Sequence, residues 1–242
     1  MRNNYFEHEL LPTVTINREV VDGTRFYRVP TGGLYPSVTS VLSTMSKEGI
    51  LEWRESVGEE KAERVMRSAA ARGTGTHQIC EDYMLNKDDY LKGAMPTSIS
   101  LFKQIQSYID ISVGKVYGIE IPLYSDKLKT AGTCDLLCQL HGMNAVVDFK
   151  TSTKAKKEEH ILSYFYQATA YALMAEEIYK MTIPYIGIII ATEEEGPQIF
   201  LKHTSKYREI VTSFFENYSC NNSDRKSTRL NSSHLGISYA VF

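Results

Sequence analysis

Hydrophobic and polar residues alternate through the segment 131–152, AGTCDLLCQLHGMNAVVDFKTS, with a break at His141-Gly142. Alternation is typical of β-strands, because successive side chains of a strand point to opposite faces. The segment therefore predicts two strands joined by a tight turn. On the second strand Asp148 and Lys150 share one face, so a carboxylate and an ammonium project together from an otherwise apolar strand.

The same patterning predicts the rest of the chain. Two N-terminal strands, 13–20 and 24–29, flank Asp22-Gly23, a strong hairpin signal, and are expected to lie outside the main sheet. A nearly continuous apolar run at 183–192 indicates a strand covered on both faces. The other predicted elements are helices at 37–45, 49–57, 59–71, 97–112, 162–180 and 207–218, a helix ending near residue 85 after a glycine-containing break at 72–76, and strands at 116–124 and 198–202.

This order of elements predicts an α/β fold, with a central mixed sheet flanked by helices and preceded by an N-terminal hairpin and a helical region. We expect a single domain over residues 1–223, divided into a hairpin (1–34), a mainly helical part (35–112) and a core (113–223) that carries the chemistry. The remaining residues, 224–242, read DRKSTRLNSSHLGISYAVF. They resemble the in-frame translation of a sequencing adapter, and we exclude them from the fold as non-native.

Composition limits the possible roles. The formal net charge is −2, so a nucleic-acid partner would have to be held by a local basic patch and by metal ions. The first ten residues do not resemble a signal peptide or a transit peptide, and the apolar run at 183–191 is too short to span a bilayer. The four cysteines form no CxxC pair. We therefore expect a cytoplasmic protein with packed thiols, no membrane association and no small-molecule cofactor.

Several polar residues could act together with this hairpin. His77 follows two glycines and shares a helix face with Glu81, which we interpret as a structural partner. Imidazole and carboxylate groups from His77, Asp135 and Asp148 would suit Mg²⁺ or Mn²⁺ better than Zn²⁺. A cation held there would polarise a phosphoryl oxygen, and Lys150 could position a water molecule and neutralise charge. A purely structural ion pair is the alternative.

Asp135 on one strand, followed by Asp148-Phe149-Lys150 on the next, resembles the motif of the PD-(D/E)xK nuclease superfamily. In that pattern an acidic residue lies on one strand of a restriction-endonuclease-like core, and Asp-x-Lys lies on its neighbour. The resemblance implies that Asp135, Asp148 and Lys150 are catalytic.

Two further motifs are similar to those of the RecB-type branch of this superfamily: Gly73-x-x-x-His77 upstream and Gln167-x-x-x-Tyr171 downstream. The likeness extends to the group that contains mitochondrial genome maintenance exonuclease and its phage relatives, and covers roughly residues 35–218. The residues that carry it are Tyr35-Pro36-Ser37-Val38-Thr39, Trp53, Arg72-Gly73, Glu120 and Asp148-Phe149-Lys150-Thr151-Ser152.

The resemblance also assigns expected roles to the remaining residues. The metal ligands it implies are His77, Asp135, Asp148 and the carbonyl of Phe149. Gln167 and Tyr171 would orient either the DNA strand or the carboxylates, and Lys154 and Arg72 are candidate phosphate contacts. Glu120 is expected either to support the metal site or to be only an edge-strand charge.

Together these features predict a Mg²⁺- or Mn²⁺-dependent DNA exonuclease that prefers single strands or DNA ends. The expected setting is replication, recombination or DNA degradation in a phage or a bacterium. Three alternatives stay open: a catalytically silent nucleic-acid-binding module, a structure-selective endonuclease, and a hydrolase of small phosphoesters. Protein partners, polarity and oligomeric state cannot be inferred from the sequence.

Overall fold

The computed structural model describes residues 5–234, with side chains described for residues 5–221. Of the segment expected to be non-native, residues 224–234 continue the last helix, and residues 235–242 lie outside the described residues. No helix in the described part is both long and apolar enough to cross a membrane.

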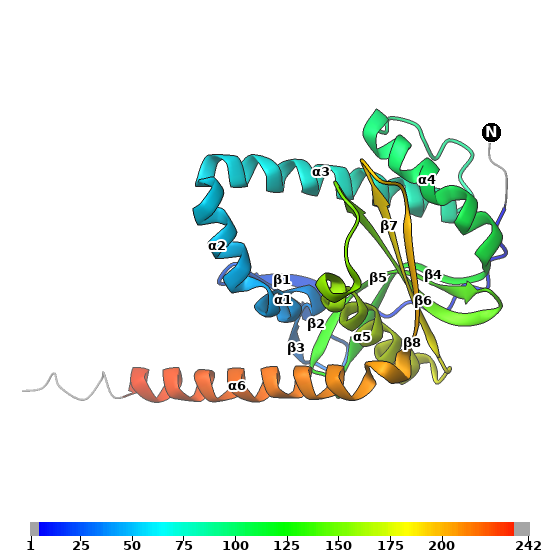
Figure 1. The fold of residues 1–242 in the computed structure, drawn as a ribbon. Helices are drawn as coiled ribbons and strands as arrows, with labels where there is room; N and C mark the ends of the chain where they lie inside the picture. The colour runs from blue at the N-terminus through cyan, green and yellow to red at the C-terminus, as the bar shows by residue number, and fades with distance from the viewer. Residues whose placement is uncertain (1–4, 235–242) are drawn as a thin grey trace, which may run out of the picture.

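A five-stranded mixed sheet forms the centre of the molecule, in the order β4-β5-β6-β7-β8 (Figure 1). β6 and β7 are parallel, and the other neighbours are antiparallel. The predicted α/β fold with a central mixed sheet is therefore confirmed. The strands are β4 (Val113–Ser125), β5 (Thr130–Leu140), β6 (Met143–Ser152), β7 (Tyr185–Thr192) and β8 (Gln198–His203).

Helices cover both faces of this sheet. Val146 and Ile188 pack on one face in the core beneath α5 (Leu162–Tyr179), and Val147 and Ile189 pack on the other beneath α3 (Glu59–Met84) and α4 (Pro96–Ser112). Every residue of β7 after Tyr185 is buried, which confirms the prediction of a strand covered on both sides.

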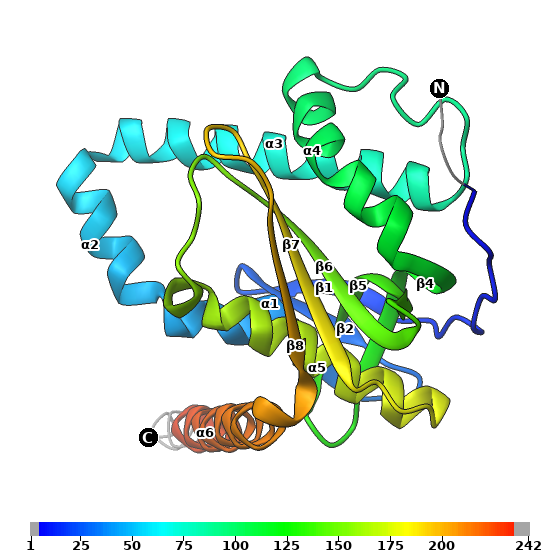
Figure 2. The same ribbon diagram turned by 45° about the vertical axis from the view of Figure 1, so that its right-hand side comes forward.

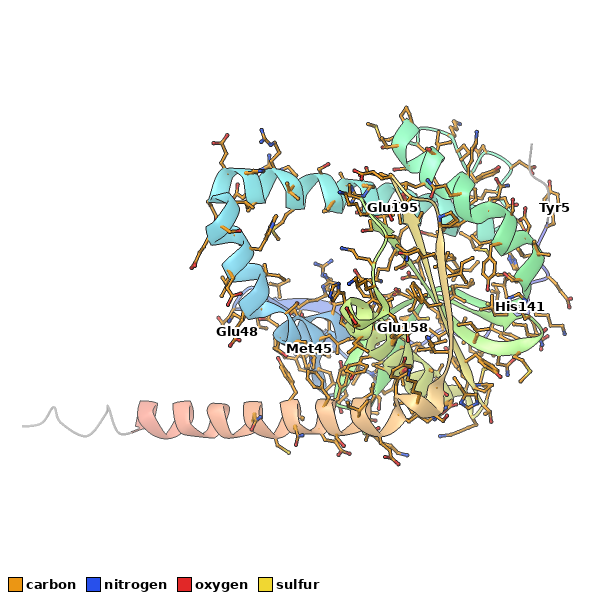
Figure 3. All side chains as sticks on the ribbon, in the orientation of Figure 1. Tyr5, Met45, Glu48, His141, Glu158 and Glu195 are labelled. Carbon is orange, nitrogen blue, oxygen red and sulfur yellow. The ribbon has the colours of Figure 1, made fainter. Side chains whose placement is uncertain are left out.

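Both predicted hairpin turns form. His141 and Gly142 have φ angles of 51° and 78°, and Asp22 and Gly23 have φ angles of 49° and 73°, as two-residue hairpin turns require. The turn at His141 lies at the opposite end of the sheet from Glu195, which belongs to the β7–β8 turn (Figure 3).

The N-terminal region forms a second sheet, which is antiparallel and separate from the first. Its strands are β1 (Asn17–Val21), β2 (Thr24–Arg28) and β3 (Leu34–Pro36). The third strand was not predicted, because three residues are too few to display an alternating pattern. Tyr27 and Val29 pack against Ala131 at the start of β5, so this sheet is attached near one end of the main sheet.

Four α-helices, α1 to α4, connect the two sheets. Ser37 caps α1 (Val38–Leu42), because its Oγ accepts a hydrogen bond from the Ser40 N–H at 3.0 Å, and the 3₁₀ turn η1 (Ser43–Met45) follows. α2 (Lys47–Val57) and the first half of α3 extend away from the sheet (Figure 2), and so does α6 (Arg208–His234) (Figure 1). A second 3₁₀ turn, η2 (Glu158–Ile161), precedes α5, and a third, η3 (Thr204–Lys206), precedes α6.

The predicted break at 72–76 is wrong, because α3 runs without interruption through Gly73 and Gly75. Glycine allows a close approach of a neighbouring element, and Gly75 lies at such a position. A Cβ atom at that position would lie 2.5 Å from the Oγ of Ser98, a buried residue in the first turn of α4. Gly75 therefore permits two helices to pack closely, and this packing offsets the low helix propensity of glycine.

The two glycines provide a matched test of this packing. Alanine at either position gains the same helix propensity, up to about 1 kcal/mol. At Gly73 the added Cβ would meet only Thr151 Oγ1, at 3.8 Å. We expect Gly75→Ala to be less stable than Gly73→Ala by about 1–3 kcal/mol in urea denaturation. Equal stability of the two variants would contradict the close contact between α3 and α4.

Candidate active site

The site lies where β5 and β6 separate. Their pairing runs from Leu140↔Met143 to Leu136↔Val147 and then stops, although β6 continues to pair with β7 as far as Ser152. Asp135 and Asp148 are the next residues on the two strands. The Phe149 N–H donates to Asp135 Oδ2 at 2.9 Å. A side-chain carboxylate therefore takes the place of a main-chain acceptor at the point of separation.

Asp148 is held from two sides. It is 1% exposed, its Oδ1 accepts a hydrogen bond from Gln167 Nε2 at 2.9 Å, and its Oδ2 forms an ion pair with Lys150 Nζ. Gln167 lies on α5. Its hydrogen bond is the contact expected of a residue that orients this carboxylate. A buried carboxylate with one cationic partner and one amide donor is fixed in a single orientation.

Burial raises the pKa of Asp148; the Lys150 charge opposes this shift and the Asp135 charge adds to it. Burial by itself would lower the pKa of Lys150, but the carboxylates of Asp148 and Asp135 reverse this effect, so that its pKa is raised overall. Lys150 consequently remains an ammonium at neutral pH, with the side chain 20% exposed. A permanent positive charge is thus held beside two carboxylates.

A second group of residues meets at the same place. His77, Glu120 and Asp135 each offer a ligand atom, and these atoms lie within 4.8 Å of one another. His77 Nδ1 lies 3.4 Å from Asp135 Oδ2. Histidine and carboxylate ligands from three different elements, α3, β4 and β5, could hold a divalent cation.

Glu120 is the least expected member of this cluster. It lies opposite Asp135, between the pairs Ile119↔Leu136 and Ile121↔Cys134, and its φ angle of 44° is uncommon for a residue other than glycine. Desolvation and the charges of Asp135 and Glu81 raise the pKa of Glu120 to about 7, although the residue as a whole is exposed. Like charges on opposite strands repel, and strained backbone is often found at functional sites.

These observations test whether the residues fit a metal ion. The donor atoms are oxygen and imidazole nitrogen, as Mg²⁺ and Mn²⁺ accept. The mutual repulsion of Glu120 and Asp135 is the kind that a bound cation would relieve. The residues therefore fit a divalent cation. From the sequence, Glu120 could either support the metal site or be only a charge on an edge strand. Strand register and backbone conformation place it beside Asp135, and neither can be read from the sequence.

The other expected site residues lie at the margin of this group. Arg72 Nη1 contacts Glu193 Oε2 at 3.1 Å and Thr153 Oγ1 at 3.4 Å. Lys154 is exposed, and its Nζ lies 3.8 Å from Glu194.

Tyr171 is buried. A Cβ atom on Gly132 would lie 2.7 Å from the Tyr171 hydroxyl, so this residue packs closely against β5. Its pKa is well above the usual value because of burial, so the hydroxyl stays protonated. The structure thus buries Tyr171 against β5 and places Arg72 and Lys154 beside Glu193 and Glu194 of the β7–β8 turn.

One neighbour of the site was missed from the sequence. The ring of Tyr164 lies 5.3 Å from Lys150 Nζ, measured to the ring centroid. Tyr164 precedes Gln167 by three residues on α5, and this helical spacing is the signal that could have identified it.

Comparisons with known proteins add little to this description. No protein-family model matches the chain, and no curated protein matches it. Among solved structures, it is similar to a crystal structure of a "Putative exonuclease" from Eubacterium rectale, with a TM-score of 0.45 and 14% sequence identity. The match covers 62% of this chain and 65% of the other, which is less than two-thirds of that protein. A likeness this distant carries no functional argument.

The raised carboxyl pKa values predict how stability depends on pH in the absence of metal. Glu120 has a pKa of about 7 in the folded protein, against about 4.3 in an unfolded chain. At pH values between these two pKa values the folded state binds more protons than the unfolded state, so stability falls as the pH rises through about 7. The pKa of Asp148 is also raised in the folded protein, so its effect on stability has the same direction. In EDTA we therefore expect a lower melting temperature at about pH 8 than at about pH 6.

Glu120→Gln should raise the melting temperature in EDTA at the higher pH and flatten this dependence. Glu52→Gln, which neutralises an exposed glutamate on α2, is the matched control and should do neither. If both variants melted identically at each pH, Glu120 would not carry the strained charge that we assign to it.

Proposed function

We propose that this protein is a divalent-metal-dependent DNA nuclease. The observation that supports the proposal best is the arrangement at the fork between β5 and β6. There Asp135 and Asp148 lie beside Lys150, and His77 and Glu120 complete a cluster that fits a cation. Phosphodiester hydrolysis mainly requires positioning and charge stabilisation, and this set of residues can supply both.

The residues of the site divide into metal ligands, a catalytic lysine and a residue that orients a carboxylate. His77, Asp135 and Glu120 would hold the cation, with Asp148 and the Phe149 carbonyl as additional ligands. Bound there, Mg²⁺ or Mn²⁺ would polarise a phosphoryl oxygen and lower the pKa of a bound water molecule. Lys150 would orient the attacking water and neutralise negative charge that develops on the phosphate. Gln167 would fix the Asp148 carboxylate through its hydrogen bond.

We further propose that the substrate is a DNA end or a single strand, that the enzyme is an exonuclease, and that it serves DNA replication, recombination or degradation in a phage or bacterial cytoplasm. This part of the proposal rests on the resemblance to RecB-type nucleases. Arg72 and Lys154 would contact phosphates, and such contacts make binding depend strongly on salt and little on sequence.

Substitution of the paired residues tests catalysis. Asp148→Asn and Lys150→Ala should each lower the rate of metal-dependent digestion of end-labelled DNA by at least about 100-fold, as for the loss of a group that stabilises the transition state. Lys103→Ala, a control on the exposed face of α4, should retain the wild-type rate. Circular dichroism must show that each variant is folded, since loss of one partner of a buried pair also costs stability.

Full activity of Asp148→Asn or of Lys150→Ala would refute the role assigned to the substituted residue. Absence of cleavage by the wild-type protein with both Mg²⁺ and Mn²⁺, with DNA binding intact, would favour a catalytically silent binding module.

The form of the substrate separates two nuclease types. An exonuclease requires an end, so circular single-stranded DNA should stay intact under conditions that degrade the same DNA after linearisation. Gel electrophoresis of both forms over one time course provides the measurement. Cutting of the circle at a comparable rate would indicate an endonuclease and would leave the metal-dependent chemistry in place.

A further inference from the structure

The Lys150 ammonium contacts two groups of different chemistry. It forms an ion pair with the Asp148 carboxylate. Its Nζ also lies 5.3 Å from the centroid of the Tyr164 ring. That distance is within the range in which an aromatic face attracts a cation through its quadrupole.

α5 positions both partners of the Asp148–Lys150 pair. Tyr164 lies in the first turn of the helix, and Gln167 lies three residues later, so the two side chains share a helix face. Gln167 donates to the Asp148 carboxylate, and Tyr164 lies beside the ammonium. A single rigid element thus contacts the anion and the cation of the pair, as precise placement of a functional site requires.

We propose that the aromatic face of Tyr164 is a positioning element that holds the Lys150 ammonium in its reactive orientation, and this proposal rests on the proposed nuclease function. The Asp148 carboxylate is shared between Gln167, Lys150 and, when it is present, the cation. The ring is shared with none of these. It attracts the ammonium without neutralising its charge and without accepting an N–H along a lone pair, so the N–H groups stay available for water or phosphate.

The hydroxyl of Tyr164 is not needed for this role. No hydrogen bond to it is found among the residues whose side chains are described. Burial raises the pKa of Tyr164, and the Lys150 charge only partly offsets this. The geometry therefore distinguishes the ring from the hydroxyl: Tyr164→Phe keeps the proposed contact, and Tyr164→Leu removes it while keeping an apolar side chain.

Graded fluorination provides the sharpest kinetic test. Phenylalanine with one, two or three ring fluorines at position 164 keeps the shape of the ring but progressively weakens its negative face. We expect kcat to fall stepwise along this series, by about tenfold in total, with KM changed by less than about twofold, and Tyr164→Leu to show a similar loss. A residue that only fills space would not respond to fluorination. Tyr108→Leu, at a half-buried tyrosine that contacts His141, is the matched control.

A second measurement is independent of activity. Protons above an aromatic ring resonate upfield, so the ε-methylene signal of Lys150, assigned with Lys150→Arg, should be shifted upfield in the wild type and in Tyr164→Phe. It should move downfield in Tyr164→Leu. If the wild type shows this shift but cuts no DNA, the nuclease proposal fails and the contact stands. A kcat that is constant across the fluorinated series, full activity of Tyr164→Leu, or an unshifted wild-type signal would each overturn the role of Tyr164.

Discussion

The separation of β5 from β6 is the constraint on which the rest of the site depends. Where the ladder ends, the Phe149 N–H needs an acceptor, and Asp135 Oδ2 supplies it. This bond holds one carboxylate at the end of the ladder, while Asp148, which precedes Phe149 on β6, is buried and paired with Lys150. Negative charges gathered in this way are unfavourable unless positive charge accompanies them. Lys150 provides part of that charge, and a divalent cation held by His77, Glu120 and Asp135 would provide more.

The helices convert this strand arrangement into a site. α3 delivers His77 from one face of the sheet, and α5 delivers Gln167 and Tyr164 from the other. The position of α3 depends in turn on its contact with α4, where Gly75 leaves room for Ser98. The glycines that precede His77 therefore act through packing. Stability and chemistry are linked here, because a change in the α3–α4 distance would move a proposed ligand.

Much of this could be predicted from the sequence, and what could not has physical causes. Alternation on β6 placed Asp148 and Lys150 on one face, and the spacing of four placed Gln167 and Tyr171 on one face of α5, because side-chain direction in a regular element follows from its period. The end of the β5–β6 ladder was not predictable, because pairing is a property of two strands and alternation describes only one. The register that sets Glu120 opposite Asp135 could not be predicted for the same reason. The left-handed backbone of Glu120 could not be predicted either, because the alternating pattern of a strand does not report the φ angle of one residue. Tyr164 was overlooked because an aromatic residue in an apolar helix has the pattern of an ordinary core residue.

The proposed function requires that the cluster of His77, Glu120 and Asp135 at the fork between β5 and β6 binds a divalent metal ion. Anomalous diffraction from crystals of the protein soaked in MnCl₂ tests it most directly, because manganese is located independently of any assumption about ligands. We expect a peak in contact with His77, Glu120 and Asp135, and no such peak in crystals of Asp135→Asn. A well-ordered manganese ion elsewhere, with no density at the fork in the wild-type protein, would show that this cluster is not the metal site.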